Sequence, residues 1–287
     1  MLPLLALLPC LLGLAAIPAQ TRLLATTDLA DRAATAVAVQ DLLGARTDLP
    51  TTVALAAVLG QRLAPGSGAR AQLDAALVAA NRSPAAAAER ALGSLRMALH
   101  DLVETLTFAP LLQAEAPKGF PEFRAVDEIE LRQYPRYRMV RTKMRGGTTA
   151  AFWPLFRHIE GNHIAMTTPV QMDWQSNDEG PGRPVQMAFL YGDPEREPGQ
   201  ADRGVEVVDV PAQTVLSIGA IGDDRRERVD ELLRRLHAAV AEHPNRLSVA
   251  GAVRTMNYNS PMVPRERRYF EVQLPVQCQA VAECQAK

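Results

Sequence analysis

Apolar side chains between residues 21 and 112 recur at intervals of three and four, the spacing of one face of an α-helix. The pattern predicts helices over about residues 27–43, 51–63 and 69–80. A fourth helix is expected to begin at Ser83, a favourable N-cap, with Pro84 in its first turn. Its apolar stripe consists of Leu92, Leu95, Leu99, Leu102, Val103 and Leu106. Residues 21–112 are therefore predicted to form a small helical bundle, or else a partly ordered Ala-rich extension.

Beyond residue 121 polar and apolar residues alternate with a period of two, which is typical of half-buried strands. Ile129 and Leu131, for example, alternate with Glu130 and Arg132. The order of elements then occurs twice, in residues 129–191 and in residues 205–274: two strands, a glycine turn, a helix and two more strands. This duplication predicts an α+β, barrel-like body of two β-α-β-β units related by a pseudo-twofold axis.

Turn and cap residues predict the element boundaries inside the two halves. Thr148 or Thr149 is expected to cap the first helix, and Asp223 or Asp224 the second. Gly219 is expected to lie in the turn before the second helix.

Proline interrupts an apolar run in each half. Residues 163–172 are predicted to form a strand, with Pro169 at a sheet edge or bulge because proline cannot complete a ladder. The segments MTTPV (166–170) and YNSPM (258–262) are predicted to be equivalent positions of the two halves.

The net charge and the catalytic motifs that the sequence lacks reduce the number of possible functions. The formal net charge is −1, which argues against nucleic acid as a partner because phosphate binding needs a concentrated basic face. The acidic residues Asp127, Glu128 and Glu130 are interpreted as the wet face of a strand. The sequence contains no G-x-S-x-G, Walker or H-E-x-x-H motif, so these observations do not favour an enzyme.

The first stretch, MLPLLALLPCLLGLAAIPAQ (1–20), is apolar to about Ala19 and is interpreted as a signal peptide, although no Lys or Arg precedes Arg22. We therefore expect an exported protein, periplasmic or extracellular. If the leader is not cleaved, it would anchor the chain, and it is the only expected contact with a membrane.

Composition predicts a linker at residues 113–121 and a C-terminal tail at 278–287. Removal of the leader leaves Cys278 and Cys284, an even number that permits a disulfide in an exported protein. Two free thiols are the alternative if the chain stays in the cytoplasm.

Three motifs in residues 122–277 resemble those of the SOUL family of haem-binding proteins: EIELRQYPRY (128–137), IAMTTPV (164–170) and NYNSPMVPRERRYFEVQL (257–274). The resemblance implies a distorted eight-stranded barrel with two helices, preceded here by the α-helical region. It also implies that haem or another tetrapyrrole binds at an apolar surface beside the first helix of that domain.

The resemblance further implies candidate site residues. Gln133 stands where some members of the family have a histidine that has been proposed as an iron ligand, and glutamine is not a usual haem ligand. On the first helix, Phe152 and Leu155 are expected to contact the ring, and Arg157 to pair with a propionate.

Three further residues are candidate iron ligands, because imidazole and thioether groups both ligate haem iron. His158 is the candidate metal ligand on the first helix, and His163 and Met166 follow it. Met166 has an alternative interpretation as core filler beside the prolyl bend, and His163 as a solvated residue.

These observations leave three hypotheses. The first is a non-enzymatic protein that binds haem or a related apolar small molecule. The second is an enzyme that removes iron from a tetrapyrrole or opens its ring. The third is an interaction module that binds apolar small molecules or partner proteins, with the helical region as the docking surface.

Overall fold

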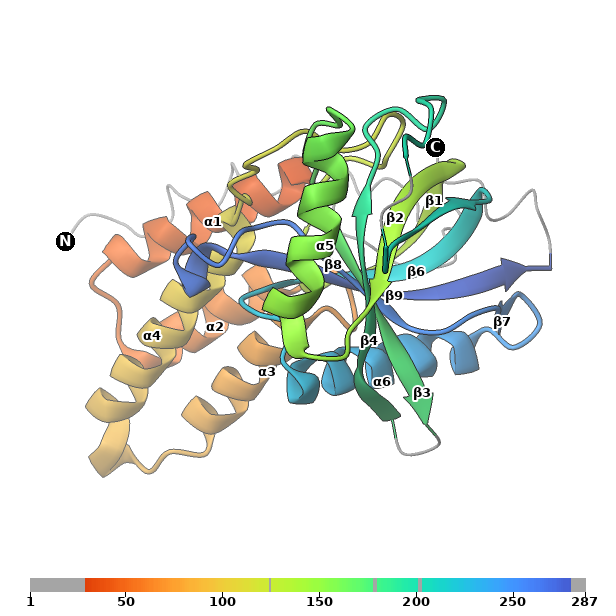
Figure 1. Ribbon diagram of the computed structural model, residues 1–287. Coiled ribbons are helices and arrows are strands. Elements are labelled where there is room, and N and C mark those ends of the chain that lie inside the picture. Colours follow the sequence, from red (N-terminus) through yellow and green to blue (C-terminus); the bar gives the residue numbers. More distant parts are fainter. Residues whose placement is uncertain (1–28, 124, 178–179, 201–202, 280–287) are drawn as a thin grey trace.

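The computed structural model describes residues 29–123, 125–177, 180–200 and 203–279, so the expected leader lies outside the described residues. A bundle of four helices comes first (Figure 1). Its elements are α1 (Leu29–Gly44), α2 (Leu49–Gly60), α3 (Gly68–Asn81), the 3-10 turn η2 (Ala85–Ala87) and α4 (Ala88–Thr107). Alanine, valine and leucine side chains of the four helices share one core, which confirms a helical bundle. Among the described helices, none has the length and hydrophobicity needed to cross a bilayer.

The start of α4 differs from the prediction. Ser83 Oγ donates a hydrogen bond to the carbonyl oxygen of Ala79 at 3.1 Å, and therefore closes the end of α3. Pro84 precedes η2, and α4 begins only at Ala88, without a side-chain cap. The predicted cap at Ser83 was wrong because its hydroxyl bonds back to the preceding turn.

The rest of the described chain forms one curled antiparallel sheet with two helices. The strands are β1 (Ile129–Tyr134), β2 (Tyr137–Lys143), β3 (Val170–Asn177), β4 (Gly180–Leu190), β5 (Glu206–Val210), β6 (Gln213–Ile221), β7 (Leu247–Val249), β8 (Arg254–Asn257) and β9 (Tyr269–Cys278). The helices are α5 (Gly147–Gly161) and α6 (Arg226–Glu242), and the 3-10 turn η3 (Arg265–Arg267) precedes β9.

The strand order contains the predicted duplication. Eight strands lie in the order β1-β6-β9-β8-β3-β4-β2-β5, and the short strand β7 pairs with β9. If β1 is exchanged with β5, β2 with β6, β3 with β8 and β4 with β9, the order becomes its own reverse. The pseudo-twofold axis therefore passes between β3 and β8, whose antiparallel register pairs Val170 with Asn257 and Asp173 with Arg254. The predicted α+β body of duplicated units is confirmed, and its sheet is curled into a half-barrel.

The two prolyl segments are not equivalent, although they touch. MTTPV precedes β3 and contains a cis bond between Thr168 and Pro169, whereas YNSPM follows β8. Thr168 Oγ1 donates to the carbonyl oxygen of Tyr258 at 2.8 Å, so the segments meet at the same end of the antiparallel pair β3–β8. Pro169 lies directly before an inner strand, where its missing N–H interrupts no ladder, so the predicted sheet edge was wrong. The predicted strand over residues 163–172 begins only at Val170.

Glycine and acidic residues also differ from their predicted roles. Gly219 lies inside β6, and a Cβ there would come within 2.4 Å of the Tyr269 hydroxyl oxygen. Neither Thr148 nor Thr149 caps α5, which follows Gly146 without a side-chain cap. Asp224 accepts hydrogen bonds from the side chains of Thr255 (2.9 Å) and Asn257 (3.0 Å), and no side chain caps α6.

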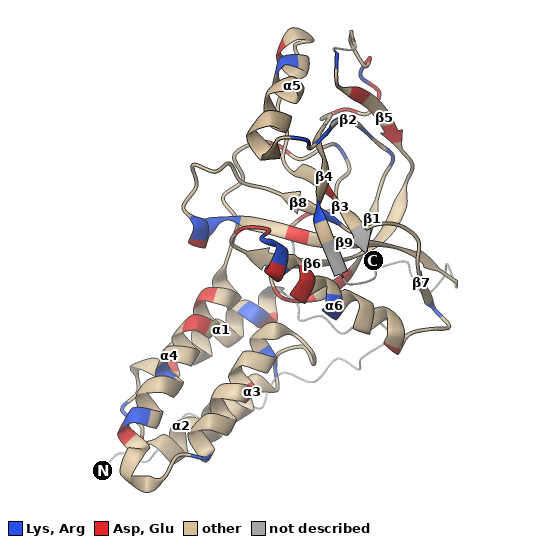
Figure 2. Cartoon of the chain, turned by 60° about the horizontal axis from the view of Figure 1, so that its bottom comes forward, with Lys and Arg blue, Asp and Glu red and all other residues tan. Residues whose placement is uncertain are grey.

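Both helices cover the same face of the sheet. Apolar residues of α6 pack on β6 and β9, and those of α5 pack on β2 and β4. Figure 2 shows α6 beside the bundle and α5 at the far end of the sheet. Arg235 of α6 donates to Asp127 at 2.5 Å and to the carbonyl oxygen of Gly66 in the bundle. One helix of the duplicated pair, α6, is therefore engaged by the bundle.

The inner face of the sheet, opposite α5 and α6, is closed by residues 108–123. Phe120 contacts the rings of Tyr134 and Tyr137 edge-on, with centroids 5.0 and 5.3 Å apart. Phe123 contacts Tyr269 in the same way, at 4.9 Å. The expected linker at 113–121 therefore packs on the sheet and forms part of this closing segment.

The acidic residues Asp127, Glu128 and Glu130 do not form a wet strand face, because Glu130 within β1 is half-buried and the other two precede the strand. Asp127 and Glu128 are buried, and each pairs with an arginine of another element, Asp127 with Arg235 and Glu128 with Arg32. The interpretation failed because partners more than ninety residues away in sequence cannot be recognised from local alternation.

Candidate functional site

The outer side of α5 carries an exposed aromatic group beside a positive charge. Phe152 stacks on Phe156 with centroids 5.6 Å apart, and Trp153 meets both rings edge-on. Trp153 is 54% exposed, whereas the two phenylalanines are half-buried. Arg157 is exposed and lies one turn beyond Trp153 on the same helix face. We call Phe152, Trp153 and Phe156 the aromatic face.

The other side of α5 is buried in the core. Leu155 and His158 are fully buried, and Leu155 packs with Phe189 of β4. His158 Nε2 lies 2.8 Å from the Tyr191 hydroxyl, which donates its own hydrogen to the carbonyl oxygen of Pro198 at 2.8 Å. A hydroxyl has one hydrogen, so Nε2 must donate to Tyr191.

This placement bears on two candidate residues. Contact between Leu155 and a ligand would require opening the core, because the side chain has no exposed surface. Iron coordination by His158 Nε2 would require the loss of its bond to Tyr191. Coordination by His158 stays a prediction.

A cleft of about 420 Å³ opens between α5 and the β4–β5 loop, of which residues 191–200 and 203–205 are described. Its lining consists of Pro154, Arg157, Gly161, Asn162, Gln200 and Arg203. Among the described residues of this lining, the polar side chains are two guanidiniums and two amides.

The loop wall of the cleft is tied to the end of α5. Asn162 Oδ1 accepts from the Gln200 backbone N–H at 2.8 Å, and its Nδ2 donates to the Gln200 carbonyl at 3.3 Å. Arg196 donates to the carbonyl oxygens of Asn162 and His163, at 3.1 and 2.8 Å. Gly199 has φ +73° and lies against the Asn162 side chain. These bonds fix one wall of the cleft to the other.

The remaining candidates lie outside the cleft lining. His163 is exposed and occupies the left-handed position that ends α5, with φ 54°. The N–H groups of His163 and Ile164 bond back to Glu160 and Ile159, the pattern of a Schellman cap. Met166 is 37% exposed in the segment that leads to β3.

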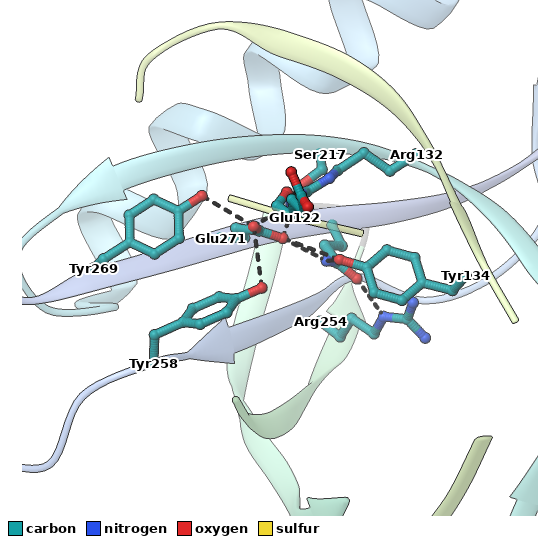
Figure 3. Close-up of polar contacts among 9 residues, drawn as sticks. Glu122, Arg132, Tyr134, Ser217, Arg254, Tyr258, Tyr269 and Glu271 are labelled. Atoms are coloured by element: carbon teal, nitrogen blue, oxygen red, sulfur yellow. Dashed lines mark hydrogen bonds and ion pairs between the residues drawn. The ribbon is translucent and has the colours of Figure 1, made fainter. Parts of the chain in front are cut away.

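A second polar cluster lies on the inner face of the sheet (Figure 3). The carboxylate of Glu271 is fully buried and forms an ion pair with Arg132. It also accepts hydrogen bonds from the hydroxyls of Tyr269 at 2.9 Å and Tyr258 at 3.1 Å. Its other donors are Ser217 (3.1 Å), Tyr134 (3.3 Å) and Gln273 (2.7 Å).

Burial and charge determine the ionisation of this cluster. Burial acts to raise the pKa of Glu271, but the Arg132 charge and the donated hydrogen bonds outweigh it, and the pKa is lowered. Burial and the Glu271 charge raise the pKa of Tyr258 and of Tyr269 well above the ordinary value. Glu271 is therefore an anion among neutral tyrosines.

The inner cluster has a structural role. Each oxygen of Glu271 is already bonded, and Phe120 and Phe123 cover the tyrosines. The outer side of α5 is different, because Trp153 is exposed to solvent and Arg157 lines an open cleft. Of the two clusters, the outer one is accessible to a ligand.

The sequence-based prediction missed Trp153, Phe156 and Arg203 as site residues. The run FWPLF (152–156) was a usable signal, because aromatic residues at consecutive positions of a helix cannot all face its core. No local signal identifies Arg203, which reaches the cleft from a loop more than forty residues further along the chain.

The family model described as SOUL heme-binding protein matches residues 119–275. No curated protein matches the chain. Among solved structures, the EcmrR C-terminal domain is 12% identical with a TM-score of 0.42, covering 52% of this chain and 97% of that one. A hydrolase from Listeria innocua is 10% identical, with a TM-score of 0.39 and coverage of 54% and 94%. SAV2435 bound to tetraphenylphosphonium is 13% identical, with a TM-score of 0.35 and coverage of 52% and 94%.

The family match includes both halves of the duplicated sheet, from the end of the segment that closes the inner face to Pro275 within β9. It spans more than half of the 287 residues and excludes the helical bundle. The chain therefore belongs to the SOUL heme-binding family.

Proposed function

We propose that this protein binds haem or a related tetrapyrrole, without transforming it, on the outer side of α5. The observation that carries the proposal is the exposed Trp153 of the aromatic face, one helical turn from Arg157, whose side chain lines an open cleft. Membership of the family supports the ligand class.

The residues present fit the chemistry of a porphyrin. A porphyrin is a flat apolar ring with two carboxylates at one edge. Aromatic side chains pack favourably on flat rings, and guanidinium pairs well with carboxylate. Trp153 and Arg157, one helical turn apart, present these two groups together.

The affinity is expected to be modest. Burial of apolar area contributes roughly 25 cal/mol per Å², and an open helix face covers only one side of a ring. Association and side-chain ordering oppose this contribution, so micromolar rather than picomolar binding is expected.

A haem titration followed by absorbance tests the proposal. The wild-type protein should give a saturable one-site change in the Soret band. Trp153→Ala should weaken binding several-fold, because it removes the most exposed ring of the aromatic face. Met97→Ala is the matched control, since Met97 is 71% exposed on α4 and its loss should leave binding unchanged.

Tryptophan fluorescence provides an independent readout. The chain has two tryptophans, and Trp174 is buried with its Nε1 bonded to Thr255. Haem should quench Trp153 strongly and Trp174 less, so Trp153→Phe should remove most of the quenching. A wild-type protein that shows neither a Soret change nor quenching would disprove haem binding.

Chemical transformation of the tetrapyrrole is less well supported than binding. The polar side chains of the lining that the structure describes are guanidiniums and amides, and neither kind of group exchanges protons near neutral pH. Bound haem incubated with a reductant and oxygen should therefore keep a stable spectrum.

The expected export is retained as part of the proposal. Cys278 is disulfide-bonded, which supports an oxidising compartment. Cys10 and Cys284 lie outside the described residues. Mass spectrometry of the protein from its native compartment should detect the bonded cysteine and a mature N-terminus near residue 20.

A further inference from the structure

We infer that the inner face of the half-barrel binds a small monovalent anion, such as a halide, beside the guanidinium of Arg254 in β8. The inference is independent of the proposed tetrapyrrole site, which lies on the opposite side of the sheet. It assigns a ligand to a buried positive charge that the inner cluster around Glu271 does not neutralise.

Three arginine side chains are buried among the described residues, and two of them have a carboxylate partner. Arg32 pairs with Glu128 at 2.6 Å, and Arg132 pairs with Glu271. Arg254 is 5% exposed and forms no ion pair with a described carboxylate; its partners are neutral side chains. Burial of a guanidinium without a counter-charge is unfavourable, so Arg254 is expected to attract an anion.

The hydrogen bonds of Arg254 show which atom would meet the anion. Nε donates to Gln273 Oε1 at 2.9 Å, and Nη1 donates to the Tyr137 hydroxyl oxygen at 3.0 Å. Nη2 is buried and has no hydrogen-bond partner among the described residues. Figure 3 shows the guanidinium turned away from Glu271, whose carboxylate Arg132 already neutralises. Nη2 is therefore a buried charged donor that a small anion would satisfy.

Asp173 of β3 is the alternative counter-ion, because the sheet register pairs it with Arg254. Its Oδ1 instead accepts a hydrogen bond from Gln171 Nε2 at 2.7 Å. Directly paired residues of an antiparallel ladder point to the same face, so the charge of Asp173 opposes an anion at Arg254. Weak binding, in the millimolar range, is therefore expected.

The surroundings of Arg254 restrict the size of the ligand. The guanidinium lies over the ring of Tyr134, 5.7 Å from its centroid, and beside the buried hydroxyl of Tyr137. Gln213, whose Nε2 lies 3.5 Å from that hydroxyl, is only half-buried, as is Asp173. Solvent therefore reaches this end of the inner face, and a small ion has a route to Nη2.

Bromide and chloride are the probes. Crystals of the full chain soaked in sodium bromide should show an anomalous peak within hydrogen-bond distance of Arg254 Nη2. In thermal unfolding, sodium chloride replaces sodium gluconate at constant ionic strength, because gluconate is too large for the site. Relative to Arg254→Met, the melting temperature of the wild type should rise saturably, by about 3–6 °C at roughly tenfold excess of chloride over its Kd.

Variants locate the anion. Arg254→Met keeps the length of the side chain but not its charge, and should lose the chloride-dependent rise. Arg254→Lys keeps the charge and should show a reduced rise. Arg234→Met is the matched control, since Arg234 is 71% exposed on α6 and its loss should leave the full rise. Asp173→Asn removes the opposing charge and should shift the midpoint of the chloride titration several-fold lower.

The bromide peak and the chloride-dependent rise are both required by the proposal. A water molecule in place of bromide at Nη2 of the wild type would overturn it, even if Arg254→Met failed to fold. A rise of equal size in the wild type and Arg254→Met would overturn it as well. If Asp173 is the true counter-ion, the wild type should show no rise, and Asp173→Asn should lower the melting temperature strongly. None of these outcomes changes the expectation for tetrapyrrole binding.

Discussion

Arg32 of α1 and Glu128, directly before β1, form a salt bridge of 2.6 Å whose side chains are 2% and 1% exposed. Arg32 also donates to the carbonyl oxygens of Thr105 at the end of α4 and of Val126. One guanidinium thus connects two helices of the bundle to the first strand of the half-barrel. A buried ion pair therefore joins the helical bundle to the half-barrel. A loosely attached extension would not need such a pair.

Removal of one partner of this pair should be far more costly than removal of both. Arg32→Leu would leave the Glu128 carboxylate buried without its cation and is expected to lower the free energy of unfolding by about 3–5 kcal/mol. The double variant Arg32→Leu, Glu128→Leu should be close to the wild type, because two apolar groups replace two charges. Urea unfolding of the single and double variants measures this coupling.

An exposed pair supplies the control for that experiment. Arg234 and Asp230 of α6 are 71% and 38% exposed and lie 3.7 Å apart. Arg234→Leu should lower the free energy of unfolding by less than about 1 kcal/mol. Equal losses from Arg32→Leu and Arg234→Leu would show that the buried pair is not a structural connection.

The duplicated sheet could be predicted from the sequence, but the surroundings of its two faces could not. Alternation of Ile129 and Leu131 with Glu130 and Arg132 indicates which side chains share a face. It does not indicate that the sheet curls and that residues 108–123 cover its inner face, so that Arg132 is 5% exposed. Tyr134, Glu271 and Gln273 meet on that face from strands far apart in the sequence.

The candidate site was predicted in part for a similar reason. Helical spacing places Phe152 and Arg157 on α5, and the aromatic run extends that face to Trp153. Helical spacing alone does not tell which side of α5 is buried, because the strands that cover it come from later in the sequence. His158 was therefore treated as accessible. Tyr191, which holds His158 in the core, is thirty-three residues away.

The ion pair of Glu271 should make part of the stability pH-dependent. Its lowered pKa means that folding favours the ionised carboxylate. The contribution of this ionisation to stability is complete at pH values above the ordinary glutamate pKa, about 4.3. It is lost as the pH falls from there through the lower pKa of the folded state. Glu271→Gln should lower the free energy of unfolding at pH 7 by about 3–5 kcal/mol, because Arg132 loses its counter-charge.

The deficit of Glu271→Gln should shrink as the pH falls below about 4.3, because the carboxyl of the unfolded wild-type chain is then protonated while folding still requires the ionised form. Denaturant unfolding at several pH values measures the difference. Glu231→Gln on the surface of α6, whose carboxylate pairs with Arg228, is the control and should show a small deficit at every pH. A deficit for Glu271→Gln that stays constant down to pH 3 would contradict the assigned ionisation.

Asp224 should show the opposite dependence on pH. Burial raises its pKa, despite hydrogen bonds from Asn257 and Thr255 that act to lower it. Folding therefore favours the neutral acid. Its contribution to stability is complete at pH values below the ordinary aspartate pKa, about 3.9, and is lost as the pH rises through the higher pKa of the folded state. Asp224→Asn should accordingly raise the melting temperature at pH 7, with a gain that fades towards pH 4.

A variant of the neighbouring residue Asp223 is the control for removing a carboxylate at this place. Asp223 pairs with Arg268 at 2.6 Å and with Arg265 at 3.4 Å, so Asp223→Asn should lower the melting temperature at pH 7. Thermal unfolding of both variants, followed by circular dichroism, compares the two signs. A lower melting temperature for Asp224→Asn at pH 7 would mean that its hydrogen bonds outweigh the cost of burying its charge.

Substitution of Gly199 should change the shape of the cleft without changing the stability of the fold. Its φ of +73° is strained for any residue with a Cβ, and a Cβ there would come within 2.3–2.9 Å of the Asn162 side chain. Gly199→Ala should therefore separate the β4–β5 loop from α5 and weaken porphyrin binding.

Gly204→Ala is the matched control, because Gly204 also has a positive φ, +92°, but a Cβ at that position would meet no atom of the described residues within 4 Å. Fluorescence titration should show the larger loss of affinity for Gly199→Ala, while urea unfolding shows similar, small changes for both variants, since a surface loop contributes little to global stability. Equal losses of affinity would mean that backbone strain in the loop, rather than its contact with Asn162, governs the cleft.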